Sequence, residues 1–405
     1  MIYRVCLLLV LALGSAQAGA ESAGENWVTS WGAAAQLTEP HNLPPAPLAG
    51  QTLRQFLRPS LGGKDLRLQV SNEFGDAPLV LEAASIALAA GSGSAGDGEI
   101  DPASSQPLSF SGSPTVSIAP GITVYSDPVE FALAPFSVVA VSMQVAASSD
   151  TAVTGHPGSR TTSFIQPGDA TLLAALPEAA RTTHWYLLTR LEVAADPRAA
   201  ALVVLGDSLS DGRGSTTDGN DRWPDQLAQR LVEQPATAQV VVVNMGIGGN
   251  AVFGGLGPAA VDRFSRDVLQ VRGARWLIIF EGVNDIGTAS EADAPGLVPR
   301  LIAAYTDFAA QAHAGGLQVY GATITPFGGS FYDSPAREAA RMAVNAWIRD
   351  NEVLDAVIDF DAVVRDPENP NRLLPAYDTG DQLHLNPEGY RAMAEGVDLG
   401  LFESR

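Results

Sequence analysis

The sequence predicts a three-layer α/β domain over residues 198–405, preceded by an all-β sandwich or jelly-roll-like lobe over residues 19–197. In the second half, apolar runs alternate with helix-like stretches, a pattern typical of a parallel sheet that helices cover on both faces. In the first half, short strand-like segments follow one another closely, with turns between them. That pattern favours two packed antiparallel sheets.

Residues 1–18 differ in character from the rest of the chain. Arg4 supplies positive charge, residues 5–13 are apolar, and residues 16–18 read Ala-Gln-Ala, a small-residue cleavage signal. We interpret this segment as a signal peptide, which predicts a secreted or periplasmic protein. The apolar run is too short to span a bilayer, and no later segment resembles a membrane anchor. Cys6 is the only cysteine, so we expect no disulfide and no thiolate site in the exported chain.

Charge and composition limit the classes of partner. The formal net charge is −21, from 45 acidic and 24 basic residues, which argues against nucleic acid or an anionic membrane as the main partner. The chain is 46% hydrophobic, which suffices for two sizeable cores. Charge and composition do not specify the ligand, and nothing in the sequence specifies an oligomeric state.

The amino-terminal half offers no obvious catalytic set. His156 and His184 are candidates for substrate contacts, although loop or core positions are the commoner use of such histidines. Trp27, Trp31 and Trp185 are either a platform for a sugar ring or core residues. Residues 196–198 form a short linker. Strands are expected at residues 27–31, 51–58, 65–71, 79–87, 115–118, 129–133, 138–145 and 186–193.

The carboxy-terminal half alternates five strands with five helices. Right-handed crossovers between parallel strands then specify a doubly wound sheet. Asn386 is a plausible cap for the last helix, which begins at Pro387. Strands are expected at residues 201–205, 240–244, 276–281, 319–323 and 357–360, and helices at 222–232, 259–271, 297–314, 335–349 and 387–401.

Polar, glycine-rich segments follow these strands, and in open α/β sheets ligands bind at the carboxyl ends of the strands. Ser208 comes just after the first strand, in Gly-Asp-Ser. A serine nucleophile needs a neutral imidazole within ~2.6–3.2 Å, and the imidazole needs a carboxylate on its other nitrogen. His384 is one of only five histidines. Asp381 lies three residues before it, so one turn can present both side chains; Asp378 is the alternative carboxylate.

Acyl transfer also requires donors for an oxyanion. A glycine lets a backbone N–H approach closely, and an asparagine amide supplies another donor. Gly249, Asn284 and the backbone N–H of Ser208 meet this need.

Four segments together resemble the SGNH, or GDSL, hydrolase family: GDSLSDG at 206–212, NMGIGGN at 244–250, GVND at 282–285 and DQLH at 381–384. The resemblance covers residues 201–401 and implies a flavodoxin-like parallel sheet. It implies Ser208 as the nucleophile, Asp381 and His384 as its partners, and Ser208, Gly249 and Asn284 as the oxyanion hole, with Asp207 as a supporting hydrogen-bonder. Gly248 stands where the family often has serine or alanine, which leaves two registers for the oxyanion glycine.

The amino-terminal half resembles the β-sandwich that precedes the hydrolase domain in a secreted bacterial subgroup. The resemblance rests on WVTSW at 27–31, TLRQFLRPSLGG at 52–63 and LRLQVSNEFG at 66–75. The family implies hydrolysis of esters, commonly lipid or small aryl esters or O-acetyl groups on glycans. Together with the signal peptide, this predicts an exported serine esterase for short-chain acyl esters, with a small-molecule ester or an acylated glycan as substrate and no cofactor. The histidines are too sparse to favour a metal site. A carbohydrate O-acetylesterase is the alternative within this chemistry. Outside it stands a glycan-binding protein with an inactive hydrolase domain.

Residues 246–251 also match G-x-G-x-x-A, a dinucleotide-binding pattern. The motif follows the second strand of the domain rather than the first, and no acidic residue ends a strand about 20 residues later. Asp262 and Asp267 fall within the next expected helix. The sequence therefore disfavours a dinucleotide.

Overall fold

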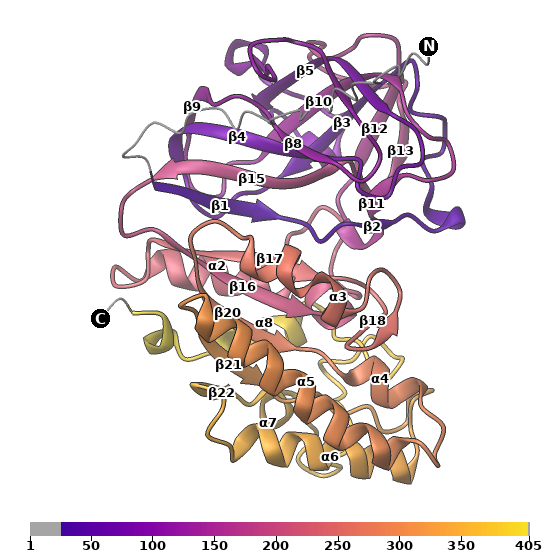
Figure 1. Cartoon of the computed structure of the whole chain (residues 1–405), viewed down its shortest axis with the longest axis vertical. Helices are drawn as coiled ribbons and strands as arrows, with labels where there is room; N and C mark the ends of the chain where they lie inside the picture. Colours follow the sequence, from indigo (N-terminus) through magenta and orange to yellow (C-terminus); the bar gives the residue numbers. More distant parts are fainter. Residues whose placement is uncertain (1–25, 404–405) are drawn as a thin grey trace, which may run out of the picture.

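A computed structural model describes residues 26–403 of the chain. Figure 1 shows an amino-terminal lobe of strands stacked on a carboxy-terminal domain of helices and strands. The segment interpreted as a signal peptide, residues 1–18, lies outside the described residues. Among the residues that are described, no helix combines the length and the apolar character needed to cross a bilayer.

The amino-terminal lobe consists of antiparallel sheets, as predicted. One sheet has the order β1 (Asn26–Gly32), β15 (Leu188–Ala195), β4 (Gly63–Ser71) and β8 (Thr123–Tyr125), with β9 (Val129–Leu133) also on β4. The second has the order β13 (Ala180–Thr182), β12 (Ser163–Pro167), β3 (Gln51–Leu57), β10 (Val139–Ala147), β5 (Leu79–Leu88) and β6 (Gln106–Pro107), with β7 (Val116–Ile118) on β5. A small third sheet contains β14 (Trp185–Tyr186), β11 (Thr154–His156) and β2 (Gln36–Leu37).

One expectation for this lobe is corrected, and one alternative that the sequence left open is decided. The strand expected at residues 186–193 is divided, because Leu187 has a φ of 64° and interrupts the extended backbone. Trp27, Trp31 and Trp185 are all buried, so they form no exposed sugar platform. Trp31 and Trp185 instead pack edge to face, with ring centroids 4.8 Å apart.

The carboxy-terminal domain has the predicted doubly wound, flavodoxin-like sheet. Its parallel strands lie in the order β17 (Val240–Gly246), β16 (Ala200–Gly206), β20 (Ala274–Phe280), β21 (Gln318–Ala322) and β22 (Ala356–Ile358). The first strand of this domain, β16, therefore lies between the second, β17, and the third, β20, and ligands bind at such a switch point. A hairpin of β18 (Asn250–Ala251) and β19 (Gly254–Gly255) follows β17.

Helices surround this sheet (Figure 1). They are α1 (Ser208–Asp211), α2 (Trp223–Glu233), α3 (Ala260–Phe264), α4 (Val283–Thr288), α5 (Ala294–Ala314), α6 (Pro335–Arg349), α7 (Phe360–Val364) and α8 (Pro387–Glu395). Five further turns of helix are the 3₁₀ segments η1 (Pro40–Asn42), η2 (Gly93–Ala95), η3 (Pro102–Ser104), η4 (Pro157–Ser159) and η6 (Leu399–Phe402). A π-helical segment, η5 (Ser265–Leu269), follows α3.

Several helix boundaries differ from those expected. The helix expected at 259–271 is α3 followed by η5. The last helix ends at Glu395 rather than at residue 401, with Gly396 as its cap. The short helices α1, α4 and α7 were not predicted, because four to six residues are too few for an apolar period to show.

A continuous apolar core joins the two parts of the molecule. It includes Leu191 and Val193 of β15 together with Val241 and Val243 of β17. At this boundary β1 lies so close to β17 that a Cβ on Gly32 would stand 2.8 Å from Val243 Cγ1. Because the core is shared, the amino-terminal lobe is packed as part of the same body.

The fully buried guanidinium of Arg263 ties together the carboxyl ends of three neighbouring strands. It donates to the carbonyl oxygens of Gly206 at 3.0 Å and Met245 at 2.6 Å, and to the Glu281 carboxylate at 3.1 Å. It also donates to Asp267, at 3.2 Å, and to the side-chain oxygen of Asn250, at 3.0 Å. One side chain thus fixes the ends of β16, β17 and β20 relative to each other.

We expect Arg263→Met to lower the free energy of unfolding by about 3–5 kcal/mol, because it leaves Glu281 buried without its cation. Chemical denaturation of the two purified proteins measures this difference. Arg391→Met is the control: its exposed pair with Glu395 should contribute less than about 1 kcal/mol. Equal effects of the two substitutions would contradict the role assigned to Arg263.

Candidate active site

Ser208 is the first residue of α1, immediately beyond the carboxyl end of β16. The Asp207 carboxylate caps this helix by accepting from the Leu209 amide at 2.9 Å. The helix ends after one turn at Gly212, whose φ of 94° is the left-handed conformation that favours glycine. As a first-turn residue, Ser208 also presents a backbone N–H that the helix itself does not use.

The structure brings Ser208, His384 and Asp381 together in a hydrogen-bonded chain. Ser208 Oγ lies 2.9 Å from His384 Nε2, and His384 Nδ1 lies 2.7 Å from Asp381 Oδ2. The carboxylate accepts only, so Nδ1 carries the proton and Nε2 accepts from the serine hydroxyl. The other oxygen of Asp381 accepts from the backbone amides of Leu383 and His384, at 3.0 and 2.8 Å. One turn therefore presents both side chains, as their spacing suggests.

The electrostatics suit this arrangement. Partial burial works against ionisation of Asp381, but the amide and ring of His384 lower its pKa to about 2. Burial lowers the pKa of His384 below 6.5; Asp381 opposes this shift, and Arg213 and Arg160 add to it. The ring is therefore neutral at pH 7 and available as a base. The alternative carboxylate, Asp378, accepts instead from the amide of Gln382 at 2.9 Å.

Gly249 and Asn284 border the same cavity as Ser208. Gly249 has a φ of 73°. The Gly248 amide already donates to Asp211 Oδ2 at 2.8 Å, which leaves Gly249 as the glycine with an amide for a ligand. Asn284, on α4, donates through Nδ2 to the Asn250 carbonyl at 2.7 Å and accepts at Oδ1 from the Tyr332 hydroxyl at 2.8 Å. These two bonds fix the amide and leave its second Nδ2 hydrogen for the cavity.

Buried carboxylates lie beneath this site. Burial raises the pKa of Asp207, and the nearby Asp285 adds to the shift. Burial also raises the pKa of Glu281, with Asp207 acting in the same direction. Asp285 accepts from the amides of Val252 and Phe253, at 2.8 and 3.1 Å. It therefore holds the loop between β18 and β19 beside the site.

The cavity has a volume of about 520 Å³ and lies between the two parts of the molecule. The carboxy-terminal domain contributes the residues described above, together with Leu256, Phe331 and Arg213. The amino-terminal lobe contributes polar groups to the opposite wall, among them Glu39, His41, Asn42, Arg160, Thr183 and His184.

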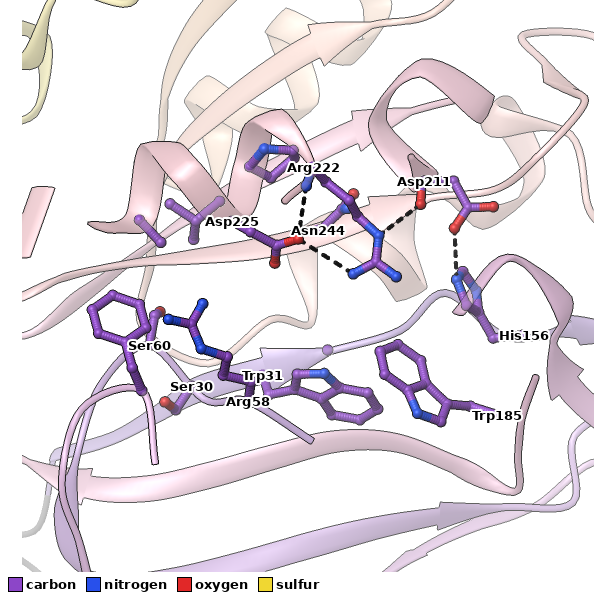
Figure 2. A pocket seen from close by; sticks show the side chains of 15 residues that line it. Ser30, Trp31, Arg58, Ser60, His156, Trp185, Asp211, Arg222, Asp225 and Asn244 are labelled. Atoms are coloured by element: carbon purple, nitrogen blue, oxygen red, sulfur yellow. Dashed lines mark hydrogen bonds and ion pairs between the residues drawn. The ribbon is translucent and has the colours of Figure 1, made fainter. Parts of the chain in front are cut away.

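A second contact between the two parts reaches the loop that carries Gly248 and Gly249. His156 of β11 bonds Asp211 Oδ1 through Nε2 at 2.9 Å and the Ala34 carbonyl through Nδ1 at 2.9 Å. Both ring nitrogens of His156 therefore lie against oxygen atoms, one in each part of the molecule. Figure 2 shows Asp211 directly above His156, with Arg222 beside it and Trp185 below. Burial opposes ionisation of Asp211, but His156, aided by Arg222 and Arg160, keeps its pKa below the usual value.

Asp211 therefore connects His156 to the loop that carries Gly249, because its other carboxylate oxygen accepts from the Gly248 amide. Sequence reasoning named His156 as a substrate contact or a core residue. The structure gives it a third position, as a buried partner of Asp211 at the end of α1. His184, in contrast, lines the cavity and bonds the Pro157 carbonyl through Nδ1 at 2.6 Å. Sequence reasoning did not single out Asp211 or Tyr332, whose partners are distant along the chain.

Two observations bear on a dinucleotide and on a metal ion. The segment with the dinucleotide pattern continues into the β18–β19 hairpin rather than into a helix. Over residues 26–403, no three of the His, Cys, Asp or Glu side chains are grouped so that they could hold a metal ion.

We expect His156→Ala to lower kcat by up to about 100-fold, because Asp211 loses the partner that fixes its carboxylate and hence the Gly248–Gly249 loop. Steady-state kinetics on an aryl acetate measure this effect. His313→Ala is the matched control, since that histidine is exposed on α5 and bonds Asp355. An unchanged kcat in a folded His156→Ala variant would show that the contact does not position the loop.

Residues 204–392 match the GDSL-like Lipase/Acylhydrolase family. A search of curated proteins gave no match. Solved structures with similar folds include a G-D-S-L family protein from Desulfitobacterium hafniense DCB-2, with 23% identity and a TM-score of 0.37 over 49% of this chain and 97% of that one. An acetylxylan esterase from Geobacillus stearothermophilus has 20% identity and a TM-score of 0.37 over 49% of this chain and 91% of that one. A GDSL-like lipase from Bacteroides thetaiotaomicron VPI-5482 has 17% identity and a TM-score of 0.35 over 50% of this chain and 87% of that one.

The family match spans the sheet that carries Ser208, Gly249 and Asn284, and it also includes the turn with Asp381 and His384. Residues 204–392 of this chain form a hydrolase domain of the GDSL-like Lipase/Acylhydrolase family.

Proposed function

We propose that this protein is a serine esterase that hydrolyses short-chain acyl esters through an acyl-enzyme. The observation that carries the proposal is the hydrogen-bonded chain from Ser208 through His384 to Asp381. It opens into a cavity that Gly249 and Asn284 also line. Nucleophile, base and orienting carboxylate thus have the mutual geometry that covalent ester hydrolysis requires.

In the first step, Ser208 Oγ attacks the ester carbonyl while His384 Nε2 takes the hydroxyl proton. The negative charge that develops on the carbonyl oxygen is bound by the amides of Ser208 and Gly249 and by Asn284 Nδ2. Loss of one such donor typically costs about 3–4 kcal/mol in the barrier. Asp381 remains ionised and stabilises the imidazolium.

The tetrahedral intermediate then collapses. The bond to the alcohol oxygen breaks as His384 returns its proton to that oxygen, which leaves the acyl group on Ser208. A water molecule, deprotonated by His384, attacks the acyl carbonyl, and collapse releases the acid and restores the serine hydroxyl. The proposed cycle uses protein groups and water, and no step calls for a metal or an organic cofactor.

The walls of the cavity favour different parts of an ester. Leu256, beside Gly249, and Phe331, beside Tyr332, are apolar and lie on the side of the oxyanion donors. That side suits the acyl group. The opposite wall, from the amino-terminal lobe, is polar, which suits an alcohol with several hydroxyl groups better than a lipid. This polarity is why a carbohydrate O-acetylesterase remains the second candidate function.

We also propose that the chain is exported, with residues 1–18 as a removable signal peptide. Residues 19–197 then form an accessory domain and residues 198–405 the hydrolase domain. Sequencing the amino terminus of protein recovered from the periplasm or medium of an expressing bacterium would test the cleavage.

We expect Ser208→Ala to abolish both ester hydrolysis and labelling by a fluorophosphonate, which reacts with activated serines. Release of p-nitrophenol and of acetate from acetylated xylan measures the two candidate activities. Labelling of the wild type by the fluorophosphonate would indicate an enzyme, whereas absence of labelling would indicate a glycan-binding protein with an inactive hydrolase domain. Full activity in Ser208→Ala would remove the nucleophile from the proposal.

The two nearby aspartates should differ strongly. We expect Asp381→Asn to lower kcat by about 10⁴-fold, since the amide cannot favour the required tautomer. Asp378→Asn is the matched control and should have a small effect, because Asp378 bonds Gln382 rather than the histidine. The reverse order in kcat would assign the orienting role to Asp378.

Activity should depend on pH through His384. The base acts only when neutral, so kcat/KM rises as pH passes upward through the pKa of the histidine. Burial lowers that pKa below 6.5, and the midpoint of the acidic limb should therefore lie below pH 6.5. A pH profile of kcat/KM measures it, and a midpoint above this value would contradict the environment described for His384.

A further inference from the structure

Two arginines line the cavity beside the proposed catalytic groups without a carboxylate partner. Arg160 belongs to the amino-terminal lobe, and Arg213 follows α1. Within the described chain, neither guanidinium forms an ion pair or a hydrogen bond, and Arg160 Nε is buried with no partner. In a protein of net charge −21, two unpaired cations in one cavity require an explanation.

The carboxylates of the same cavity are occupied elsewhere. Glu39 accepts from the side-chain amides of Gln36 and Asn42, at 2.6 and 3.1 Å. Asp211 is bonded to His156 and the Gly248 amide, and Asp381 to His384. The two guanidinium groups therefore border the cavity without a carboxylate partner from its lining.

The backbone around both arginines is held firmly. Arg160 has a φ of 49°, a left-handed conformation that is unusual for a residue with a side chain. Its carbonyl accepts from the Asp218 amide at 2.8 Å, and the Asp218 carboxylate accepts from the Thr162 amide at 2.8 Å. Strained residues held in this way cluster at functional sites.

Arg213 is anchored in a similar manner. It follows Gly212, and its carbonyl accepts from the Tyr390 hydroxyl at 2.7 Å. Both side chains therefore project from fixed points, one on each side of the boundary between the amino-terminal lobe and the hydrolase domain.

The position of the arginines indicates which part of an ester they would meet. Both are close enough to His384 to oppose its protonation. In the proposed reaction His384 returns its proton to the leaving alcohol, so the alcohol lies on the histidine side and the acyl group on the side of Gly249 and Asn284. We propose that Arg160 and Arg213 form a subsite for a carboxylate on the alcohol part of the ester, as in an acylated uronic acid residue. The inference rests on the proposed esterase function and adds a substrate class to it.

The test compares two acetyl esters of the same shape, para-acetoxybenzoate, which carries the carboxylate, and para-acetoxybenzamide, which is neutral. The readout is the ratio of their kcat/KM values. We expect the wild type to favour the anion by about tenfold, which one good charge-assisted contact would supply. Arg160→Gln and Arg213→Gln should each reduce this ratio several-fold, and the double variant should bring it near one. Arg198→Gln, an exposed pair with Asp196, is the control that should keep the wild-type ratio.

A second readout separates charge from damage to the fold. Because both arginines lower the pKa of His384, their replacement should move the acidic limb of the neutral ester's pH profile upward. Acetate release from acetylated polygalacturonate, relative to acetylated xylan, distinguishes an acidic sugar chain from a small acid as the source of the carboxylate.

The outcomes separate the two proposals. If the wild type hydrolyses both aryl esters at equal kcat/KM, or if the arginine variants keep the wild-type ratio, the subsite is wrong while the esterase stands. If neither ester is hydrolysed and the fluorophosphonate labels nothing, the esterase proposal itself fails.

Discussion

The buried guanidinium of Arg263 is the contact on which the geometry of the site depends. It donates to carbonyl and carboxylate oxygens at the ends of β16, β17 and β20, and to the side-chain oxygen of Asn250. The Asn250 carbonyl in turn accepts from Asn284 Nδ2, and Asn284 Oδ1 accepts from the Tyr332 hydroxyl. A buried ion pair often adds little net stability compared with a well-packed apolar substitute. What Arg263 supplies is a fixed distance between the loop after β17 and the loop after β20.

The amino-terminal lobe supplies the other half of this control. Its apolar residues share one core with the parallel sheet. Its His156 bonds the Asp211 carboxylate, which also accepts from the Gly248 amide. The same lobe forms the polar wall of the cavity. The lobe therefore belongs to the architecture of the site, and a description of the carboxy-terminal domain alone omits one wall and one positioning contact.

Much of this architecture follows from local pattern. Apolar runs that alternate with helix-like stretches predicted the parallel strands, and the three-residue spacing of Asp381 and His384 predicted that one turn could present both. The sequence could not predict the pairing of His156 with Asp211, since 55 residues separate them. No local sequence pattern shows that β11 of the amino-terminal lobe contacts α1 of the carboxy-terminal domain. The burial of Trp31 and Trp185 has the same origin, because a tryptophan in a strand is compatible with either face. Leu187 shows the same limit for backbone conformation. Its left-handed φ depends on tertiary contacts, which the strand propensity of the residue does not include.

The contacts of the segment around Arg160 limit how the sequence of such a chain can evolve. Asp218 binds it from one side, and Arg222 donates to the Ser159 carbonyl from the other. The position of Arg160, in the amino-terminal lobe, is thus fixed by Asp218 and Arg222 of the carboxy-terminal domain. Arg222 also donates to the Asp211 carbonyl, so these contacts belong to the same hydrogen-bonded group as Asp211. Such a lobe cannot be exchanged for that of a relative as an independent module. Substitutions on the two sides of the boundary must be compatible, so the two halves of the chain are expected to diverge together.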